Sequence, residues 1–299
     1  MSVYGWFKGA GPSGFGYTST AEDVTAGLDL AGRTVLLTGC NAGLGQEAMR
    51  VLQLRGARVV GTARTVDKAR AAGSDLPLAC ELSDPASVRA CVASVVAAGL
   101  RLDAIIGNAG IMALPRLELA HGYELQFFTN HIGHFILVTG LLGQLAETGR
   151  VVMLSSEGHR VAPSGGIDFD NLDGARGYSR WRTYGRSKMA NLLFAMELAR
   201  RFAGTQRTAN AVHPGVIATK LTRHSGVIAA GAAVLSPLVL KTVGQGAATE
   251  VYVATNPTLA GVSGEYFADS NLAKPRRDAR DPALAAKLWT VSEQIVAGL

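Results

Sequence analysis

Tyr184 and Lys188 are four positions apart at the start of a segment with helical periodicity. At this spacing both side chains lie on one face of a helix. A free phenol titrates near pH ~10, so it exchanges protons poorly at neutral pH. A neighbouring ammonium stabilises the phenolate and lowers its pKa. The pair therefore predicts a general acid or base.

A glycine-rich segment lies far upstream, between an apolar run at residues 33–38 and a helical pattern at residues 44–55. Glycines there let backbone N–H groups approach phosphate oxygens, and the N-terminus of the next helix adds positive potential. Glycines also end strands for unrelated reasons, but the position between a strand and a helix favours dinucleotide binding. The residues expected at the pyrophosphate are Gly39, Asn41, Ala42, Gly43, Leu44 and Gly45. Together with Tyr184, this segment predicts hydride transfer.

The composition indicates one large, well-buried α/β domain. Of the 299 residues, 48% are hydrophobic and 17% are charged, and 36 are glycines. The formal net charge of +6 comes from scattered basic residues without interleaved aromatic residues, which argues against nucleic-acid binding. We expect the positive field to attract a polyphosphate cofactor instead.

The features that report on location favour a cytoplasmic protein. Cys40, Cys80 and Cys91 match no metal-binding spacing and no disulfide framework, which suits a reducing compartment. The N-terminus lacks the basic flank and apolar core of a signal peptide. The most apolar stretch, residues 226–240, is shorter than a membrane span and contains Pro237, so no stable membrane anchor is expected.

Apolar runs alternate with helical patterns along most of the chain. Buried strands are predicted at residues 33–38, 58–63, 76–82, 102–107, 150–156, 207–213 and 264–267. Helices are predicted at residues 44–55, 66–72, 85–98, 119–145, 181–202 and 282–296, the fourth with a break near Gly122. This alternation predicts a single α/β domain at residues 31–299, with a doubly wound parallel sheet and helices on both faces. Residues 1–30 show no strong period and are expected to form an N-terminal arm.

The end of the second strand bears on the choice of cofactor. A free ribose 2′-hydroxyl usually meets an acidic residue here, whereas this chain has Arg64. An arginine suits a 2′-phosphate better, and Lys68 adds charge one turn further on. We therefore expect NADP(H) rather than NAD(H); the alternative is that Arg64 is a solvated surface residue.

Two further strand ends carry residues suited to a dinucleotide. Glu81 and Leu82 end the third strand, where the carboxylate can accept a hydrogen bond from the adenine amino group. Asn108, Ala109 and Gly110 form a tight turn after the fourth strand. Open α/β sheets bind ligands outside the carboxyl ends of their strands, so motifs at three consecutive strand ends predict one site.

Two other polar residues are expected beside Tyr184. Ser156 ends the fifth strand, where its hydroxyl can hold a substrate oxygen against the phenol. Asn130 can hold a water near Lys188, although an asparagine inside a helix is more often a structural polar group. Lys188 is also expected to hydrogen-bond the nicotinamide ribose.

These motifs resemble those of the short-chain dehydrogenase/reductase family over residues 30–268. The matching marks are Thr-Gly-x-x-x-Gly-x-Gly at residues 38–45, Asn-Ala-Gly at 108–110 and Tyr-x-x-x-Lys at 184–188. The resemblance implies a Rossmann-type domain whose catalytic residues are Asn130, Ser156, Tyr184 and Lys188. It also implies that the segment after His213 contacts the nicotinamide through Pro214, Gly215, Val216 and Thr219.

Within this family the chain resembles the retinol dehydrogenase and WW-domain oxidoreductase branch. The similar pieces are residues 130–135, 155–159 and 184–192. Members of that branch often act on apolar carbonyls and alcohols with NADP(H). Two departures from the family pattern stand out. Glu81 replaces the usual aspartate, and Ser156 lies 28 positions before Tyr184 because of an insertion that the branch shares.

The insertion and the segment after Thr219 should form the substrate side. Asp168 and Asp170 are interpreted as an acidic turn rather than metal ligands. Residues 220–243 predict an apolar lid over the nicotinamide, with core or oligomer packing as the alternative. Such a lid would exclude water and favour a hydrophobic substrate. The expected pocket residues are Met112, Leu114, His159, Trp181, Val216 and Leu221.

The sequence therefore predicts an NADP(H)-dependent oxidoreductase acting on an apolar carbonyl or alcohol, with Tyr184 as the general acid/base. Two alternatives are a protein that senses NADP(H) without chemistry and an interaction protein that uses the apolar face at residues 226–240. The complete set of Ser156, Tyr184 and Lys188 favours the enzyme. The resemblance further implies a homo-oligomer.

Overall fold

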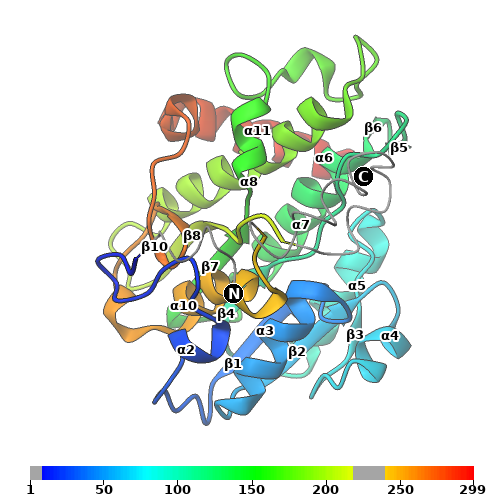
Figure 1. Cartoon of the computed structure of the whole chain (residues 1–299). Coiled ribbons are helices and arrows are strands. Elements are labelled where there is room, and N and C mark those ends of the chain that lie inside the picture. Colours follow the sequence, from blue (N-terminus) through cyan, green and yellow to red (C-terminus); the bar gives the residue numbers. More distant parts are fainter. Residues whose placement is uncertain (1–8, 218–239) are drawn as a thin grey trace.

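A computed structural model describes residues 9–217 and 240–299, which form an eight-stranded sheet between two layers of helices (Figure 1). The sheet has the order β10-β9-β8-β7-β4-β1-β2-β3, and all neighbours are parallel except β9 and β10. Its strands are β1 (Thr34–Thr38), β2 (Arg58–Ala63), β3 (Leu78–Ala79), β4 (Leu102–Gly107), β7 (Leu145–Leu154), β8 (Thr208–His213), β9 (Tyr266–Ala268) and β10 (Asn271–Leu272). A separate hairpin consists of β5 (Leu119–Ala120) and β6 (Tyr123–Glu124).

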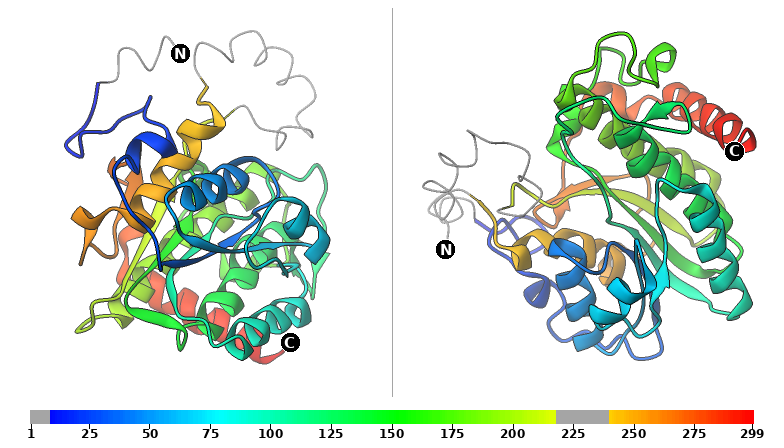
Figure 2. Two further views of the ribbon diagram at one scale, coloured as in Figure 1. Left: turned by 90° about the horizontal axis from the view of Figure 1, so that it is seen from below. Right: turned by 90° about the vertical axis from the view of Figure 1, so that its right-hand side faces the viewer.

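The helices divide between the two faces of the sheet (Figure 2). One layer contains α2 (Ala21–Val24), α3 (Gly43–Leu54), α4 (Val66–Ala71) and α10 (Val243–Thr255). The other contains α5 (Pro85–Ala97), α6 (Leu125–Phe127), α7 (Gly133–Gly140), α8 (Arg180–Arg201) and α11 (Pro282–Ala297). Helix starts follow local signals: Asp84, for example, accepts a hydrogen bond from the Ala86 N–H at 3.0 Å, ahead of Pro85 in the first turn.

Strand β1 shows why the buried strands are continuous apolar runs. Val35 and Leu37 belong to the core under α3 and α10, whereas Leu36 belongs to the core under α5 and α8. All three side chains are almost fully buried, so neither face of the strand can carry a polar residue cheaply. The predicted doubly wound parallel sheet is confirmed.

The strand order places a crevice at one edge of the sheet. β1 pairs with β2 on one side and with β4 on the other, so the chain reverses direction across the sheet at this point. Ligands of open α/β sheets bind outside the carboxyl ends of the strands at such a switch point. The carboxyl ends here include Thr38, Ala63, Gly107, Leu154 and His213.

The described part of the N-terminal arm is attached to the domain. Ala21 and Val24 of α2 are buried against α10. The Phe15 ring makes an edge contact with Tyr252 at 5.6 Å, and Asn271 donates to the Phe15 carbonyl at 2.9 Å. Residues 9–30 therefore contribute to the core that also supports the cofactor turn.

The long helix predicted at residues 119–145 is wrong at both ends. Its first part is the β5–β6 hairpin, which turns at His121 (φ 52°) and Gly122 (φ 83°). Its last part belongs to β7, which begins at Leu145 rather than at residue 150. Between them, α6 and α7 are joined by a π-helical turn at Phe128–Ile132. Strand β3 is also much shorter than predicted, with only two residues.

Candidate active site

The glycine-rich turn between β1 and α3 has the geometry of an anion cradle. Gly39 and Gly43 have φ values of 72° and 55°, the left-handed region that favours glycine. A Cβ on Gly45 would lie 2.3 Å from the Gly39 carbonyl oxygen, so no larger residue fits there. Ala42 is the N-cap of α3, and its side chain makes no capping hydrogen bond. The first N–H groups of the helix are therefore free to bind an anion at this edge of the sheet.

The turn after β4 is joined to this cradle through Thr38. The Asn108 side chain donates to the Thr38 carbonyl at 2.7 Å, and the Ala109 N–H donates to the Thr38 hydroxyl at 2.9 Å. A Cβ on Gly110 would lie 3.1 Å from Asn130 Oδ1 and 3.4 Å from Lys188 Nζ. The structure thus brings the predicted cofactor turn and the predicted catalytic residues to one place.

Tyr184 and Lys188 lie on α8 and are both almost fully buried. The Lys188 ammonium is 5.8 Å from the centre of the Tyr184 ring and donates to the Leu154 carbonyl at 2.9 Å. Leu154 is the last residue of β7, so the lysine is fixed to the carboxyl end of a central strand. Burial lowers the Lys188 pKa to about 8, and the nearby Glu250 opposes this shift.

The expected lowering of the Tyr184 pKa by Lys188 is not found in this structure. Burial raises the Tyr184 pKa, and only a hydrogen bond with the Ser156 side chain counteracts it. The physical reason is that removal from water disfavours the phenolate more than the surroundings stabilise it. The phenol is therefore protonated at neutral pH, which makes it a proton donor.

Ser156 follows β7 and is held beside the phenol by several contacts. Its hydroxyl accepts from the Gly158 N–H at 3.0 Å, and it caps the 3-10 turn Glu157–Val161. The next N–H, that of Glu157, donates to His213 Nδ1 at the end of β8 at 3.3 Å. These bonds fix the hydroxyl where a substrate oxygen could contact both Ser156 and Tyr184.

Asn130 lies in the π-helical turn and is fully buried. Its amide oxygen accepts from the Ile111 N–H at 2.8 Å, and its amide nitrogen donates to the Ile111 carbonyl and to the Ser187 hydroxyl, both at 2.9 Å. The side chain therefore joins the segment after Gly110 to α8.

The residues predicted around the adenosine half lie along the same edge. Arg64 and Lys68 are exposed, and neither makes an ion pair within the described residues. Glu81 accepts from the Ser83 N–H and hydroxyl through one carboxylate oxygen, at 3.2 and 2.9 Å. Leu82 is buried, and its carbonyl would be 2.2 Å from a Cβ on Gly133, which brings α7 close to the end of β3.

The segment after β8 approaches the crevice from the other side. Gly215 has a φ of 91°, and a Cβ there would collide with the Lys241 side chain at 2.6 Å. Pro214 is buried, whereas Val216 is 63% exposed and accepts from the Lys241 N–H at 2.9 Å. Thr219, Leu221 and all but the last residues of the predicted lid at 220–243 lie outside the described residues.

The described pocket candidates do not all have the expected surroundings. Trp181 is 38% exposed and makes an edge contact with the Tyr184 ring at 6.4 Å. Met112 and Leu114 are half-buried beside the turn after β4, and the Leu114 carbonyl accepts from Tyr178. His159, however, is fully buried.

The expected substrate contact of His159 is wrong, because both of its ring nitrogens are already engaged. Nδ1 contacts the Ser156 carbonyl at 2.6 Å, and Nε2 accepts from the Arg276 N–H at 3.0 Å. The residue therefore supports the Ser156 turn from beneath rather than lining an opening.

Three buried polar residues near the site were not predicted. Arg186, inside the Tyr184–Lys188 motif, pairs with Glu124 at 3.6 Å and donates to the Asn171 and Leu172 carbonyls. Glu250 on α10 is fully buried, and neither carboxylate oxygen has a hydrogen-bond partner within the described residues. His134 lies one helical turn after Asn130, and this spacing alone could have indicated that the two face the same way.

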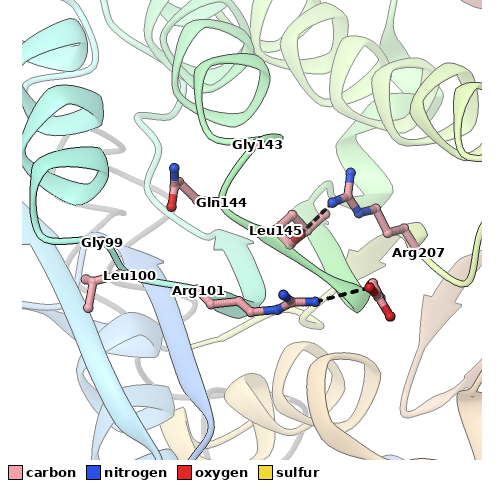
Figure 3. Close-up of a pocket in the computed structure, with 8 residues that line it drawn as sticks. Gly99, Leu100, Arg101, Gly143, Gln144, Leu145 and Arg207 are labelled. Carbon is pink, nitrogen blue, oxygen red and sulfur yellow. Dashed lines mark hydrogen bonds and ion pairs between the residues drawn. The ribbon is translucent and has the colours of Figure 1, made fainter.

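Two depressions on the described surface lie away from this site. One, of about 400 Å³, is at the amino ends of β4 and β7, where Arg101 pairs with Glu147 at 3.9 Å and Arg207 donates to the Leu145 carbonyl at 2.6 Å (Figure 3). The other, of about 500 Å³, lies between the β5–β6 hairpin and α11. Neither is lined by residues of the carboxyl edge near Tyr184.

In the part of the chain that the structure describes, none of the helices is both long enough and apolar enough to cross a bilayer. No group of His, Cys, Asp and Glu side chains within residues 9–217 and 240–299 is arranged to hold a metal ion. Asp168 and Asp170 lie at a short 3-10 turn in the insertion.

Known proteins with the same features identify the family. The short chain dehydrogenase family model matches residues 33–169. "Short-chain dehydrogenase TIC 32 B, chloroplastic" of Brassica napus is 41% identical over all of both chains. Retinol dehydrogenase 12 of Mus musculus is 38% identical over 91% of this chain and 89% of its own. The chain belongs to the short-chain dehydrogenase family and is an oxidoreductase of that family, and its resemblance to the retinol dehydrogenase branch is confirmed.

Solved structures agree with this assignment. An uncharacterized protein from Mycobacterium paratuberculosis has a TM-score of 0.74 and 32% identity, covering 92% of this chain and 97% of its own. A blue fluorescent protein from a metagenomic library, in complex with NADPH, has a TM-score of 0.64 and 26% identity, covering 80% and 97%. Both share the fold of the described domain.

Proposed function

We propose that this protein is an NADP(H)-dependent reductase of apolar carbonyl compounds, with the reverse oxidation of the alcohol at the same site. The observation that carries the proposal is the buried Tyr184 phenol. It is hydrogen-bonded to Ser156 and lies beside Lys188 at the carboxyl edge that also holds the glycine-rich turn. The uncapped start of α3 fits a dinucleotide pyrophosphate because its free N–H groups suit an anion.

In the proposed reaction the residues of this chain bind the substrate oxygen and supply its proton. NADPH, when bound, supplies the hydride that forms the new C–H bond at the carbonyl carbon. Ser156 donates a hydrogen bond to the carbonyl oxygen and orients it. As the C=O π electrons move onto that oxygen, Tyr184 transfers its phenolic proton to it. Lys188 stabilises the resulting phenolate, and solvent restores the proton.

The preference for NADP(H) rests on the charge at the end of β2. Arg64 and Lys68 are exposed near the position expected for the adenosine ribose, and the end of β2 carries no acidic residue to accept from a 2′-hydroxyl. A guanidinium can make two parallel hydrogen bonds to a phosphate. The NADPH complex of the blue fluorescent protein is consistent with this choice.

The proposed substrate is an apolar small molecule. Trp181, whose ring contacts that of Tyr184, and Val216 are exposed apolar residues, and Met112 and Leu114 are half-buried in the segment after the turn at residues 108–110. Retinol dehydrogenase 12, by its name, acts on an apolar alcohol, and we extend that class to this chain. We also propose that the protein is cytoplasmic and homo-oligomeric and that residues 31–299 form one catalytic domain.

A screen of NADPH oxidation over aldehydes, ketones and quinones of graded size tests this function. The alcohol direction with NADP+ is run alongside, and NADH serves as the comparison cofactor. We expect turnover to rise with the apolar area of the substrate and to be greater with NADPH. Tight NADPH binding without turnover on any substrate would favour the NADP(H)-sensing alternative.

A further inference from the structure

His134 connects the cofactor turn to the catalytic side of the site. It lies on α7, is fully buried, and has both ring nitrogens within hydrogen-bond distance of a partner. Nδ1 is 2.9 Å from the Asn130 carbonyl oxygen, and Nε2 is 2.9 Å from the Thr38 hydroxyl. The same Thr38 hydroxyl accepts from the Ala109 N–H at 2.9 Å. The imidazole therefore bridges β1 and the π-helical turn.

The groups on either side of His134 fix the direction of the hydrogen bonds in this series. The Asn130 carbonyl can only accept, so Nδ1 of His134 carries the proton. Burial lowers the His134 pKa to about 4, so the ring is neutral at physiological pH and Nε2 is an acceptor. The Thr38 hydroxyl then donates to Nε2 at 2.9 Å, which is closer than its other acceptor, the Ile106 carbonyl at 3.5 Å, while it accepts from Ala109. The four groups form one oriented series from the Ala109 amide to the Asn130 carbonyl.

Asn130 lies inside the π-helical turn Phe128–Ile132. In this turn the Gly133 N–H reaches the Phe128 carbonyl, five residues back, instead of the usual four. The regular helical register is therefore interrupted beside Asn130. Its side chain holds Ile111 and Ser187, so a rotation of its backbone would move the segment after Gly110 and the start of α8.

We propose that His134 is a positioning residue that couples occupancy of the Asn108-Ala109-Gly110 turn to the orientation of Asn130. This inference rests on the proposed function, because that function places the dinucleotide at the turn. A nucleotide that holds the Ala109 backbone fixes Thr38, and the imidazole carries this constraint to the Asn130 carbonyl.

Substitutions at His134 separate its two contacts. In His134→Asn the amide occupies the position of Nδ1 and can still donate to the Asn130 carbonyl, but it cannot reach Thr38. In His134→Gln the amide occupies the position of Nε2 and can still contact Thr38. His134→Leu removes both contacts, and His131→Leu is the matched control. His131 is equally buried, but it contacts Ser292 on α11 instead of the site.

The experiment measures the NADPH dissociation constant by nucleotide fluorescence and kcat at saturating NADPH. For His134→Leu we expect about 10-fold or greater weakening of binding and a similar loss of kcat, from unpaired buried polar groups. His134→Asn should recover most of kcat but not binding, whereas His134→Gln should recover binding but not kcat. His131→Leu should change neither the NADPH dissociation constant nor kcat. Identical behaviour of all three His134 variants, or the same split in the control, would overturn the proposal.

A double-mutant cycle on NADPH binding makes the test independent of turnover. Thr38→Val breaks the same link from the other end, and the fold of each variant is checked by thermal unfolding. We expect the effects of Thr38→Val and His134→Leu on NADPH binding to be strongly non-additive. Additive effects would overturn the coupling. A wild-type protein that binds NADPH but reduces no carbonyl refutes the proposed function, while the cycle still decides the role of His134.

Discussion

The dinucleotide side of the sheet edge is built from backbone, whereas the catalytic side is built from buried side chains. On the first side, Gly39, Gly43 and the uncapped start of α3 form the cradle through main-chain conformation. On the second, Asn130 and Lys188 are held by hydrogen bonds to main-chain groups far away in the sequence. The backbone cradle restricts which residue types can occupy its positions. The side-chain network instead requires that every buried polar group keeps its partner.

The largest expected effect is on the catalytic side. Tyr184→Phe removes the proton donor without changing the cradle, so kcat should fall by about 100- to 10,000-fold while NADPH binding persists. Steady-state rates and nucleotide fluorescence measure the two properties separately. Tyr252→Phe, at a buried tyrosine on α10 on the other face of the sheet, is the control. Near-normal turnover of the Tyr184→Phe protein would show that Tyr184 is not the proton donor, and the catalytic side would then not depend on this buried side chain.

The second largest effect is expected at the buried ion pair between Arg186 and Glu124. Arg186→Met leaves the Glu124 carboxylate buried without its cation, so the free energy of unfolding should drop by about 3–5 kcal/mol. Denaturant unfolding measures this loss. The double change Arg186→Met with Glu124→Gln should recover much of it, because no charge then remains unpaired. Failure of the double variant to recover stability would mean that the guanidinium acts through its carbonyl contacts to the insertion instead.

The difference between local backbone features and distant side-chain contacts also explains which parts of the molecule could be predicted from the sequence. The ends of β1, β2, β4 and β8 were predicted to within about a residue, because buried parallel strands are apolar runs that stop at local signals. Arg64, Glu81 and the turn after β4 were placed at the same edge for the same reason. These inferences need only local chain properties and the parallel order of the strands.

The errors arise where distant contacts decide. Residues 119–145 have a helical apolar pattern, yet His121 and Gly122 adopt left-handed conformations and the β5–β6 hairpin forms instead. The Lys188 ammonium was expected to lower the Tyr184 pKa, but burial raises that pKa and only the hydrogen bond with Ser156 lowers it. His159 and Glu250 could not be understood from the sequence either, because their burial depends on helices and strands that meet only in the fold.

Glu250 gives a pH-dependent test of the side-chain network. Burial raises its pKa from 4.5 to about 8, so the folded protein binds a proton that the unfolded chain has lost between these values. This contribution to stability is complete below about pH 4.5 and is lost as pH rises through about 8.

The substitution Glu250→Gln should remove this pH dependence. The variant should match the wild type at acidic pH and exceed its unfolding free energy by about 1–3 kcal/mol above pH ~8. Thermal or denaturant unfolding across the pH range is the measurement, with Glu265→Gln at an exposed site as the control. Parallel pH profiles for the wild type and Glu250→Gln would show that the carboxyl is ionised without penalty.

The smallest expected effect concerns the cofactor side. Arg64→Glu should shift the ratio of the NADPH and NADH dissociation constants by about three- to tenfold in favour of NADH. The effect is small because the interaction is exposed and screened by salt. Arg70→Glu, on the α4 helix that follows Arg64, makes the same charge change at a residue already paired with Asp67. Competitive fluorescence titrations compare the two. Equal effects of both changes would indicate a general field rather than a contact with the 2′-phosphate.

The most direct measurement of the central claim follows deuterium from cofactor to product. NADPH deuterated at C4 of the nicotinamide is incubated with the wild-type protein and an apolar aldehyde identified in the screen. We expect deuterium on the carbinol carbon of the alcohol, and little or no labelled alcohol from the Tyr184→Phe protein. Alcohol formed without deuterium from either face of the ring, or no alcohol with any carbonyl despite bound NADPH, would contradict this claim.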